Sequence, residues 1–253
     1  MSVVLNEAAI RLEMAPLLDA PEVSDGLRAM VNSRFLLAFF LMSVSEGEAM
    51  GEAGVATLRE EEIAQLIHDI ERQEREEGSH KEGTANLGRE LFPEFFDGDE
   101  YRYNSKLTGR DYYLTVLQQN RQYLKKYGRY SRLNLYLMTT FGYEIMVVLY
   151  YTAVIDAVEA SKLPSALKAR VASELRRILS EEETHLEIED QHNALLAADA
   201  SKLSERTRDL LKALGGLKVE DYRWATELSM HEVVKMIGRY SAGDTFQREI
   251  EAP

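Results

Sequence analysis

The chain has 253 residues, 45% of them hydrophobic, and its 43 acidic against 30 basic side chains give a net charge of −13. This excess of acid argues against a protein that binds nucleic acid or an anionic membrane. The sequence contains no cysteine, which excludes disulfides, zinc–thiolate sites and a cysteine nucleophile. Any metal would therefore be held by oxygen and imidazole ligands.

The first residues lack the basic and long apolar segments of a secretory signal, and the mean hydropathy is −0.31. The most apolar run, residues 35–44, is about half the length of a membrane span. We therefore expect a cytoplasmic protein with no membrane span.

Helices are expected to dominate because only five prolines interrupt the chain, at positions 16, 21, 93, 164 and 253. A start signal around Pro21 and Asp25 predicts a first long helix over residues 27–53. A second helix follows an acid-rich first turn after Leu58 and is stopped by Pro93.

Residues 94–132 differ in character from the rest of the chain. Residues 94–110 are expected to form a loop and residues 111–127 a shorter, more polar helix. From residue 101 to 132 there are eight basic residues, one acid and seven of the thirteen tyrosines. This basic stretch could receive an anionic substrate or an acidic partner such as a carrier protein; a solvated amphipathic helix explains it equally well.

Two further long helices are predicted over residues 133–161 and 165–196, and two weaker ones over 204–214 and 219–237. No strand-like alternation or internal repeat is visible. We predict an all-α single domain of residues 1–253, with a core of four long helices over about residues 25–196, an insertion at 94–132 and C-terminal helices within 203–240.

The most informative pattern lies in the helix over residues 165–196. Steps of three and four residues place seven side chains on one helix face: Leu175, Ile178, Glu182, His185, Glu189, His192 and Leu196. The apolar ends of this stripe mark the core face, so its carboxylates and imidazoles would be carried into the interior. Buried charge is costly unless it is compensated, and a metal ion would compensate it.

The second long helix carries the same spacing, with Glu77 and His80 on a stripe that also contains Gln73 and Thr84. A Glu-x-x-His pair places both side chains on one face, where they can reach one or two metal ions together. Glu144 is the only charged residue between Arg132 and Asp156, so we interpret it as a buried ligand.

The ligand from the first long helix is ambiguous, because Glu46 and Glu48 each continue an apolar stripe. Glu189 and His192 form a further Glu-x-x-His pair. For these two we favour a role beside the ligands over direct ligation, since Glu182 and His185 already complete a set of six.

Acidic helices can produce single Glu-x-x-His motifs by accident. Three of the five histidines, however, have glutamate three residues earlier. Four carboxylates and two neutral imidazoles around two divalent ions would be nearly neutral, whereas the same carboxylates in an empty core would repel one another and protonate. Ligands of this kind suit iron or manganese.

One glutamate from each of two helices and a Glu-x-x-His from each of two others resembles the ferritin-like di-iron or di-manganese carboxylate superfamily. The resemblance covers about residues 25–196. Within it, Glu46-Gly47-Glu48, the run Glu77-x-x-His80-Lys81-x-Gly83-x4-Gly88-Arg89-x-Leu91 and Glu182-x-x-His185-Leu186 are most similar to aldehyde-deformylating oxygenases. The resemblance favours Glu48, which directly follows a glycine, over Glu46. The segment between Glu77 and Glu144 is about a dozen residues longer than the family pattern.

The resemblance implies a ferritin-like antiparallel four-helix bundle and an oxygenase with two iron ions, or one manganese and one iron. Dioxygen would be the co-substrate, and the centre would comprise Glu48, Glu77, His80, Glu144, Glu182 and His185. The substrate would be a small aliphatic molecule such as a fatty aldehyde or acyl-derived compound, lodged among Phe35, Phe39, Leu41, Val147 and Tyr151.

No flavin or nicotinamide fingerprint is visible, so turnover would need an external electron donor such as ferredoxin. We expect a monomer or homodimer that binds no nucleic acid. The alternative is iron storage or peroxide scavenging by a ferritin- or rubrerythrin-like protein, which would form a cage or a large oligomer.

Overall fold

The computed structural model describes residues 7–58, 67–97, 100–101, 118, 132–197 and 219–252. Within these ranges the secondary structure is helical apart from one short antiparallel pair, β1 (Phe96–Asp97) and β2 (Glu100–Tyr101), with Phe96 opposite Tyr101. The predicted all-α class is confirmed. The helices expected over residues 111–127 and 204–214 lie outside the described residues.

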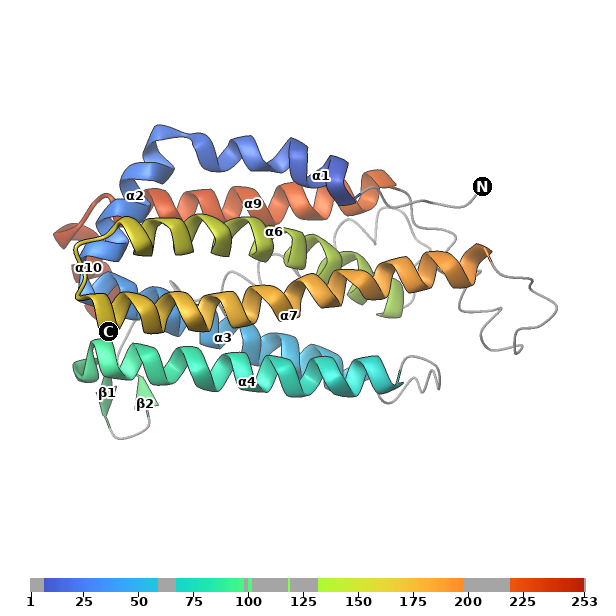
Figure 1. Ribbon diagram of the computed structural model, residues 1–253, viewed down its shortest axis with the longest axis horizontal. Helices are drawn as coiled ribbons and strands as arrows, with labels where there is room; N and C mark the ends of the chain where they lie inside the picture. Colours follow the sequence, from blue (N-terminus) through green and yellow to red (C-terminus); the bar gives the residue numbers. More distant parts are fainter. Residues whose placement is uncertain are drawn as a thin grey trace.

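Four long helices run along the longest axis of the molecule (Figure 1). They are α3 (Arg34–Leu58), α4 (Ile67–Leu91), α6 (Arg132–Ala160) and α7 (Ser165–Ala197). The chain reverses direction between α3 and α4 and again between α6 and α7, so each pair is antiparallel. The pairs meet through contacts of α4 with α7 and of α3 with α6.

The stripes predicted for α4 and α7 are confirmed where side chains are described. On α4 the buried residues include Gln73, Glu77, His80, Thr84 and Leu87, and on α7 they include Leu175, Ile178, Glu182 and His185. On α6 the buried residues include Glu144, Val148, Tyr151, Ile155 and Val158. All four long helices thus carry polar side chains into the core, since Glu48 of α3 is buried as well.

The first predicted helix proves to be two helices. Helix α2 (Pro21–Asn32) ends at Ser33, whose extended backbone separates it from α3. The Ser33 hydroxyl accepts a hydrogen bond from the Leu36 amide at 3.2 Å, which caps the start of α3. The continuous helix expected over residues 27–53 is therefore wrong at its first turns, because the serine cap ends one helix and begins the next.

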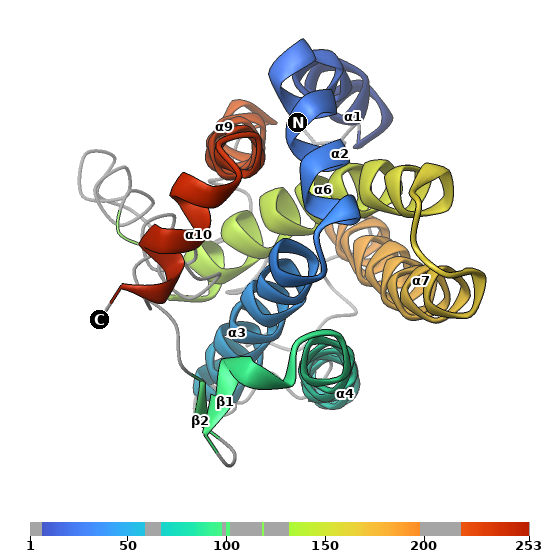
Figure 2. The same ribbon diagram turned by 90° about the vertical axis from the view of Figure 1, so that its left-hand side faces the viewer.

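A second group of helices covers the α6 side of the molecule (Figure 2). Helix α9 (Val219–Tyr240) packs on α6 and α2, and α1 (Glu7–Met14) packs on α9. A 3-10 helix, η1 (Ala15–Asp19), joins α1 to α2, and another, η3 (Pro93–Phe95), follows α4. Helix α10 (Asp244–Glu251) places Phe246 against Phe39. The sequence patterns did not predict α1 or α10.

No single helix in the described ranges is long and apolar enough to cross a membrane. Helix α2 and the first part of α3 together reach the length and apolar content of a span, but they are bent by 104° at their junction. The side chains from Phe35 to Val44 in this pair are buried within the protein.

Candidate metal centre

The four long helices bring six of the predicted residues together in the core. Helix α3 contributes Glu48, α4 contributes Glu77 and His80, α6 contributes Glu144, and α7 contributes Glu182 and His185. All six residues are buried, with at most 6% of their surface exposed. Two groups of donor atoms lie close enough to hold a metal ion each: Glu48, Glu77, His80 and Glu182 form the first, and Glu144, Glu182 and His185 form the second.

Both histidines turn the same nitrogen towards the carboxylates. His80 Nδ1 lies 3.3 Å from Glu182 Oε1 and 3.7 Å from Glu48 Oε2. His185 Nδ1 lies 3.1 Å from Glu182 Oε2 and 3.5 Å from Glu144 Oε1. Glu182 thus faces both imidazoles, one oxygen to each, as a carboxylate that bridges two metal ions would.

The remaining nitrogen of each histidine donates to a glutamate of the opposite helix. His80 Nε2 on α4 lies 2.6 Å from Glu181 Oε2 on α7, and His185 Nε2 on α7 lies 2.8 Å from Glu76 Oε2 on α4. Each glutamate directly precedes a predicted ligand, Glu182 or Glu77. Such partners fix the ring orientation of a ligating histidine and leave its other nitrogen for the metal.

Two neutral side chains hold the glutamates from α3 and α6. Tyr151 Oη donates to Glu48 Oε1 at 3.2 Å, and Gln73 Nε2 donates to Glu144 Oε1 at 3.0 Å. Sequence reasoning placed both residues on the core face without assigning them this role. The sequence did contain a sign of this role for Gln73, because its amide lies one turn before Glu77 on the core face.

Burial and the crowding of like charges perturb the carboxylic acids. Burial, reinforced by Glu48, raises the pKa of Glu77 well above its ordinary value. Burial also raises the pKa of Glu144 to about 7, against the opposing effect of His185. Glu182 is the exception, because the imidazoles of His185 and His80 that face it outweigh its burial and lower its pKa to about 2.

The pKa values of both histidines are raised, although burial alone would lower them. Burial lowers the pKa of His80, but the carboxylates of Glu182 and Glu48 raise it more, to about 10. For His185 the carboxylates of Glu144 and Glu182 outweigh burial and raise the pKa to about 12. Without a metal, the centre therefore stays compensated by holding protons on its imidazoles.

Three donor atoms in the first group are buried and make no hydrogen bond: Glu48 Oε2, His80 Nδ1 and Glu182 Oε1. Buried polar atoms without partners are rare in native proteins and call for a ligand, an ion or a water. One imidazole nitrogen and two carboxylate oxygens that face one another fit a divalent transition metal. The residues present therefore fit the group that the sequence pattern implies.

Of the three further candidates, Glu46, Glu189 and His192, the structure describes only the side chain of Glu46. Glu46 is only partly buried on α3 and belongs to neither group of donor atoms. Glu189 and His192 lie on α7 beyond Leu186, the last residue of that helix whose side chain the structure describes. Glu48, and not Glu46, is the residue of α3 that faces His80.

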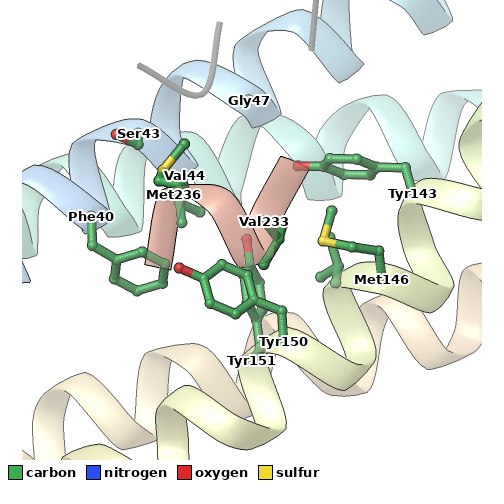
Figure 3. A pocket seen from close by; sticks show the side chains of 11 residues that line it. Phe40, Ser43, Val44, Gly47, Tyr143, Met146, Tyr150, Tyr151, Val233 and Met236 are labelled. Atoms are coloured by element: carbon green, nitrogen blue, oxygen red, sulfur yellow. The ribbon is translucent and has the colours of Figure 1, made fainter. Parts of the chain in front are cut away.

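A small apolar cavity of about 40 Å³ opens next to the centre, between α3, α6 and α9. Gly47 and Tyr151, which flank Glu48, line it together with Phe40, Met146 and other side chains. Figure 3 shows Tyr143, Tyr150 and Tyr151 entering it from α6, with Val233 and Met236 contributed by α9.

The lining of this cavity differs from the residues that the resemblance implied. Val147 and Tyr151 line it as expected. Phe35 instead packs against Phe92 and Phe95, and Phe39 packs against Phe246. Leu41 is fully buried but does not line the cavity. The sequence did not predict that α9 lines the cavity, because its weak hydrophobic periodicity does not indicate which helices it packs against.

Comparison of the chain with models of protein families, with curated proteins and with solved structures finds no match.

Proposed function

We propose that this protein is an oxygen-activating oxidoreductase with a dinuclear metal centre. In this proposal the four long helices form a ferritin-like four-helix bundle. The observation that carries it is the convergence of four buried glutamates and two buried histidines, drawn from all four helices, beside an apolar cavity. The ions would be two irons, or one manganese and one iron, since this ligand set suits those metals.

The glutamates and histidines of the centre would have different roles. Glu182 belongs to both halves of the centre, whereas Glu48 and Glu77 belong to the first half and Glu144 to the second. His80 and His185 would supply Nδ1, because Nε2 of each is engaged by a glutamate of the opposite helix. When bound and reduced, the metals would supply the electrons and the binding positions that dioxygen activation requires.

The cavity supports an apolar substrate held next to the Glu48 side of the centre. Its walls combine aromatic rings, methionine and valine side chains. Apolar walls of this kind suit an aliphatic chain. The proposed substrate is accordingly a fatty aldehyde or another acyl-derived molecule, with electrons delivered by an external donor such as ferredoxin.

A direct test incubates the reduced, metal-loaded protein with dioxygen and a panel of aldehydes of increasing chain length. With a chemical reductant added, the proposal expects a hydrocarbon shortened by one carbon and formate that carries the lost aldehyde carbon. Both the wild type and Lys235→Ala, a substitution at an exposed position of α9, should form these products. Met236→Trp fills the cavity and should shift the preference to shorter chains. Glu144→Ala should abolish the product.

Two results would replace this proposal. Oxidation of many irons per chain with no organic product, in a particle of cage size on size exclusion, would indicate iron storage. Rapid consumption of peroxide with no organic product would indicate a scavenger.

A further inference from the structure

We propose that the two metal positions fill in a fixed order, with the position formed by Glu48, Glu77, His80 and Glu182 occupied first. This inference rests on the proposed dinuclear centre. It concerns how the two halves of that centre differ, which the symmetric Glu-x-x-His motifs do not reveal.

The first position has its donor atoms open. Glu48 Oε2, His80 Nδ1 and Glu182 Oε1 are buried, make no hydrogen bonds and face one another across 3.3 and 3.7 Å. A metal entering here satisfies three buried polar atoms and replaces only the ion pairs of His80 Nδ1 with Glu182 and Glu48, at 3.3 and 3.7 Å. Buried groups without partners are costly, so their satisfaction favours binding.

The second position has its donor atoms engaged with one another. His185 Nδ1 makes a hydrogen bond of 3.1 Å with Glu182 Oε2, and Glu144 Oε1 accepts the amide of Gln73 at 3.0 Å. A metal entering here must first break the bond between His185 and Glu182. That exchange reduces the net gain, because only the difference between the new and the old interactions counts.

The histidine of the first position is also braced more firmly from behind. Its partner Glu181 accepts hydrogen bonds from Arg177 Nη1 at 2.8 and 3.1 Å, and Arg177 Nη2 donates to Glu174 at 2.7 Å. The Glu174 carboxylate occupies the space that a side chain at position 83 would need, so Gly83 lets it lie against α4. The support behind His185 is weaker, because its partner Glu76 lies 3.7 Å from Arg72 Nε, beyond hydrogen-bond distance.

These differences point in one direction. A ligand held by a chain of hydrogen bonds is preorganised and loses less freedom when the metal binds. Open donors and a braced histidine both belong to the first position, whereas engaged donors and a loosely supported histidine belong to the second.

The test is a titration of chelator-treated full-length protein with Mn(II), followed by electron paramagnetic resonance and calorimetry. The inference predicts that the signal of isolated bound Mn(II) rises up to one equivalent. It should then fall as the second ion couples to the first, with the two dissociation constants at least about tenfold apart.

Variants assign the order. Glu144→Ala should keep the tight first step and lose the second, while Glu48→Ala should lose the tight step. Arg177→Gln should weaken the first step by about 10- to 100-fold. The matched control Arg176→Gln, whose arginine pairs with Glu159 at the surface, should leave both steps unchanged.

If the first additions of Mn(II) already gave the signal of two coupled ions, the proposed order of filling would be wrong. It would also be wrong if the tight step survived in Glu48→Ala and disappeared in Glu144→Ala. The absence of any bound Mn(II) in folded protein would instead overturn the proposed dinuclear centre itself.

Discussion

Glu76 and Glu181 are the residues that link the two motif helices, each through the histidine of the opposite helix. Each lies on one motif helix and contacts the histidine of the other, so the same doublet, Glu-Glu-x-x-His, contains a proposed ligand and a support for the opposite histidine. The doublet was visible in the sequence. Its meaning was not, because a helix surface rich in glutamate gives no indication of which carboxylate reaches across to a neighbouring helix.

Removing one of these supports should weaken metal binding without changing any ligand. Glu181→Gln is expected to lower the metal affinity by about 10- to 100-fold, since a neutral amide orients His80 poorly and makes its ring less basic. Calorimetric titration measures the effect, and Glu183→Gln, at an exposed neighbouring position, is the control. Equal affinities for the two variants would contradict the role given to Glu181.

The titrating groups predict an unusual pH dependence for the metal-free protein. The pKa values of Glu77, Glu144, His80 and His185 are all raised, so above about pH 5 the folded state holds more protons than the unfolded state. Stability then decreases as pH rises. Glu144 contributes to this loss between its ordinary value of 4.5 and about 7, and the histidines contribute from 6.5 up to about 10 and 12. The lowered pKa of Glu182 acts in the opposite sense, but only below 4.5.

Thermal unfolding measured from pH 5 to 9 tests this expectation. The melting temperature of chelator-treated protein should fall across the range, while that of metal-loaded protein should fall much less, because the metal replaces the protons. A metal-free melting temperature that rises with pH would show that these groups do not titrate as described.

At the scale of elements, close helix contacts at glycine set the position of α9. A side-chain carbon at Gly26 on α2 would lie 2.0 Å from the Ile237 carbonyl oxygen of α9, and one at Gly142 on α6 would lie 2.8 Å from the Thr226 amide nitrogen. Both obstacles are backbone atoms and cannot swing away. Because α9 supplies Val233 and Met236 to the cavity, these two contacts fix one cavity wall.

The chain contains a matched control for this effect. Gly26→Ala should destabilise the fold by about 1–3 kcal/mol through overpacking against α9. Gly238→Ala, where nothing lies within 4 Å, should stabilise it by up to about 1 kcal/mol through helix propensity. Urea unfolding compares the two variants. If both alanines acted alike, the close approach of α2 to α9 would be wrong.

The long helices could be predicted from sequence because each carries a clear stripe of three- and four-residue steps. Periodicity could not locate the break at Ser33, since residues 35–44 are apolar on every side and show no phase. The same uniformity left Glu46 and Glu48 equivalent by pattern. Only the packing of α3 against α4 places Glu48 beside His80.

At the scale of the whole molecule, the isolated Glu144 and the two Glu-x-x-His pairs predicted which residues would meet, because a charged residue on an apolar face needs a partner. The cavity could not be predicted in the same way. Its lining comes from three helices distant in sequence, and its size depends on how closely their side chains pack.

The metal content of the protein tests the proposed dinuclear centre. Protein purified without chelator and reconstituted with iron or manganese should contain close to two ions per chain by elemental analysis. Glu144→Ala should reduce this to about one, and the circular dichroism of both proteins should remain helical. A fully folded wild-type protein that binds no iron or manganese under these conditions would contradict the account.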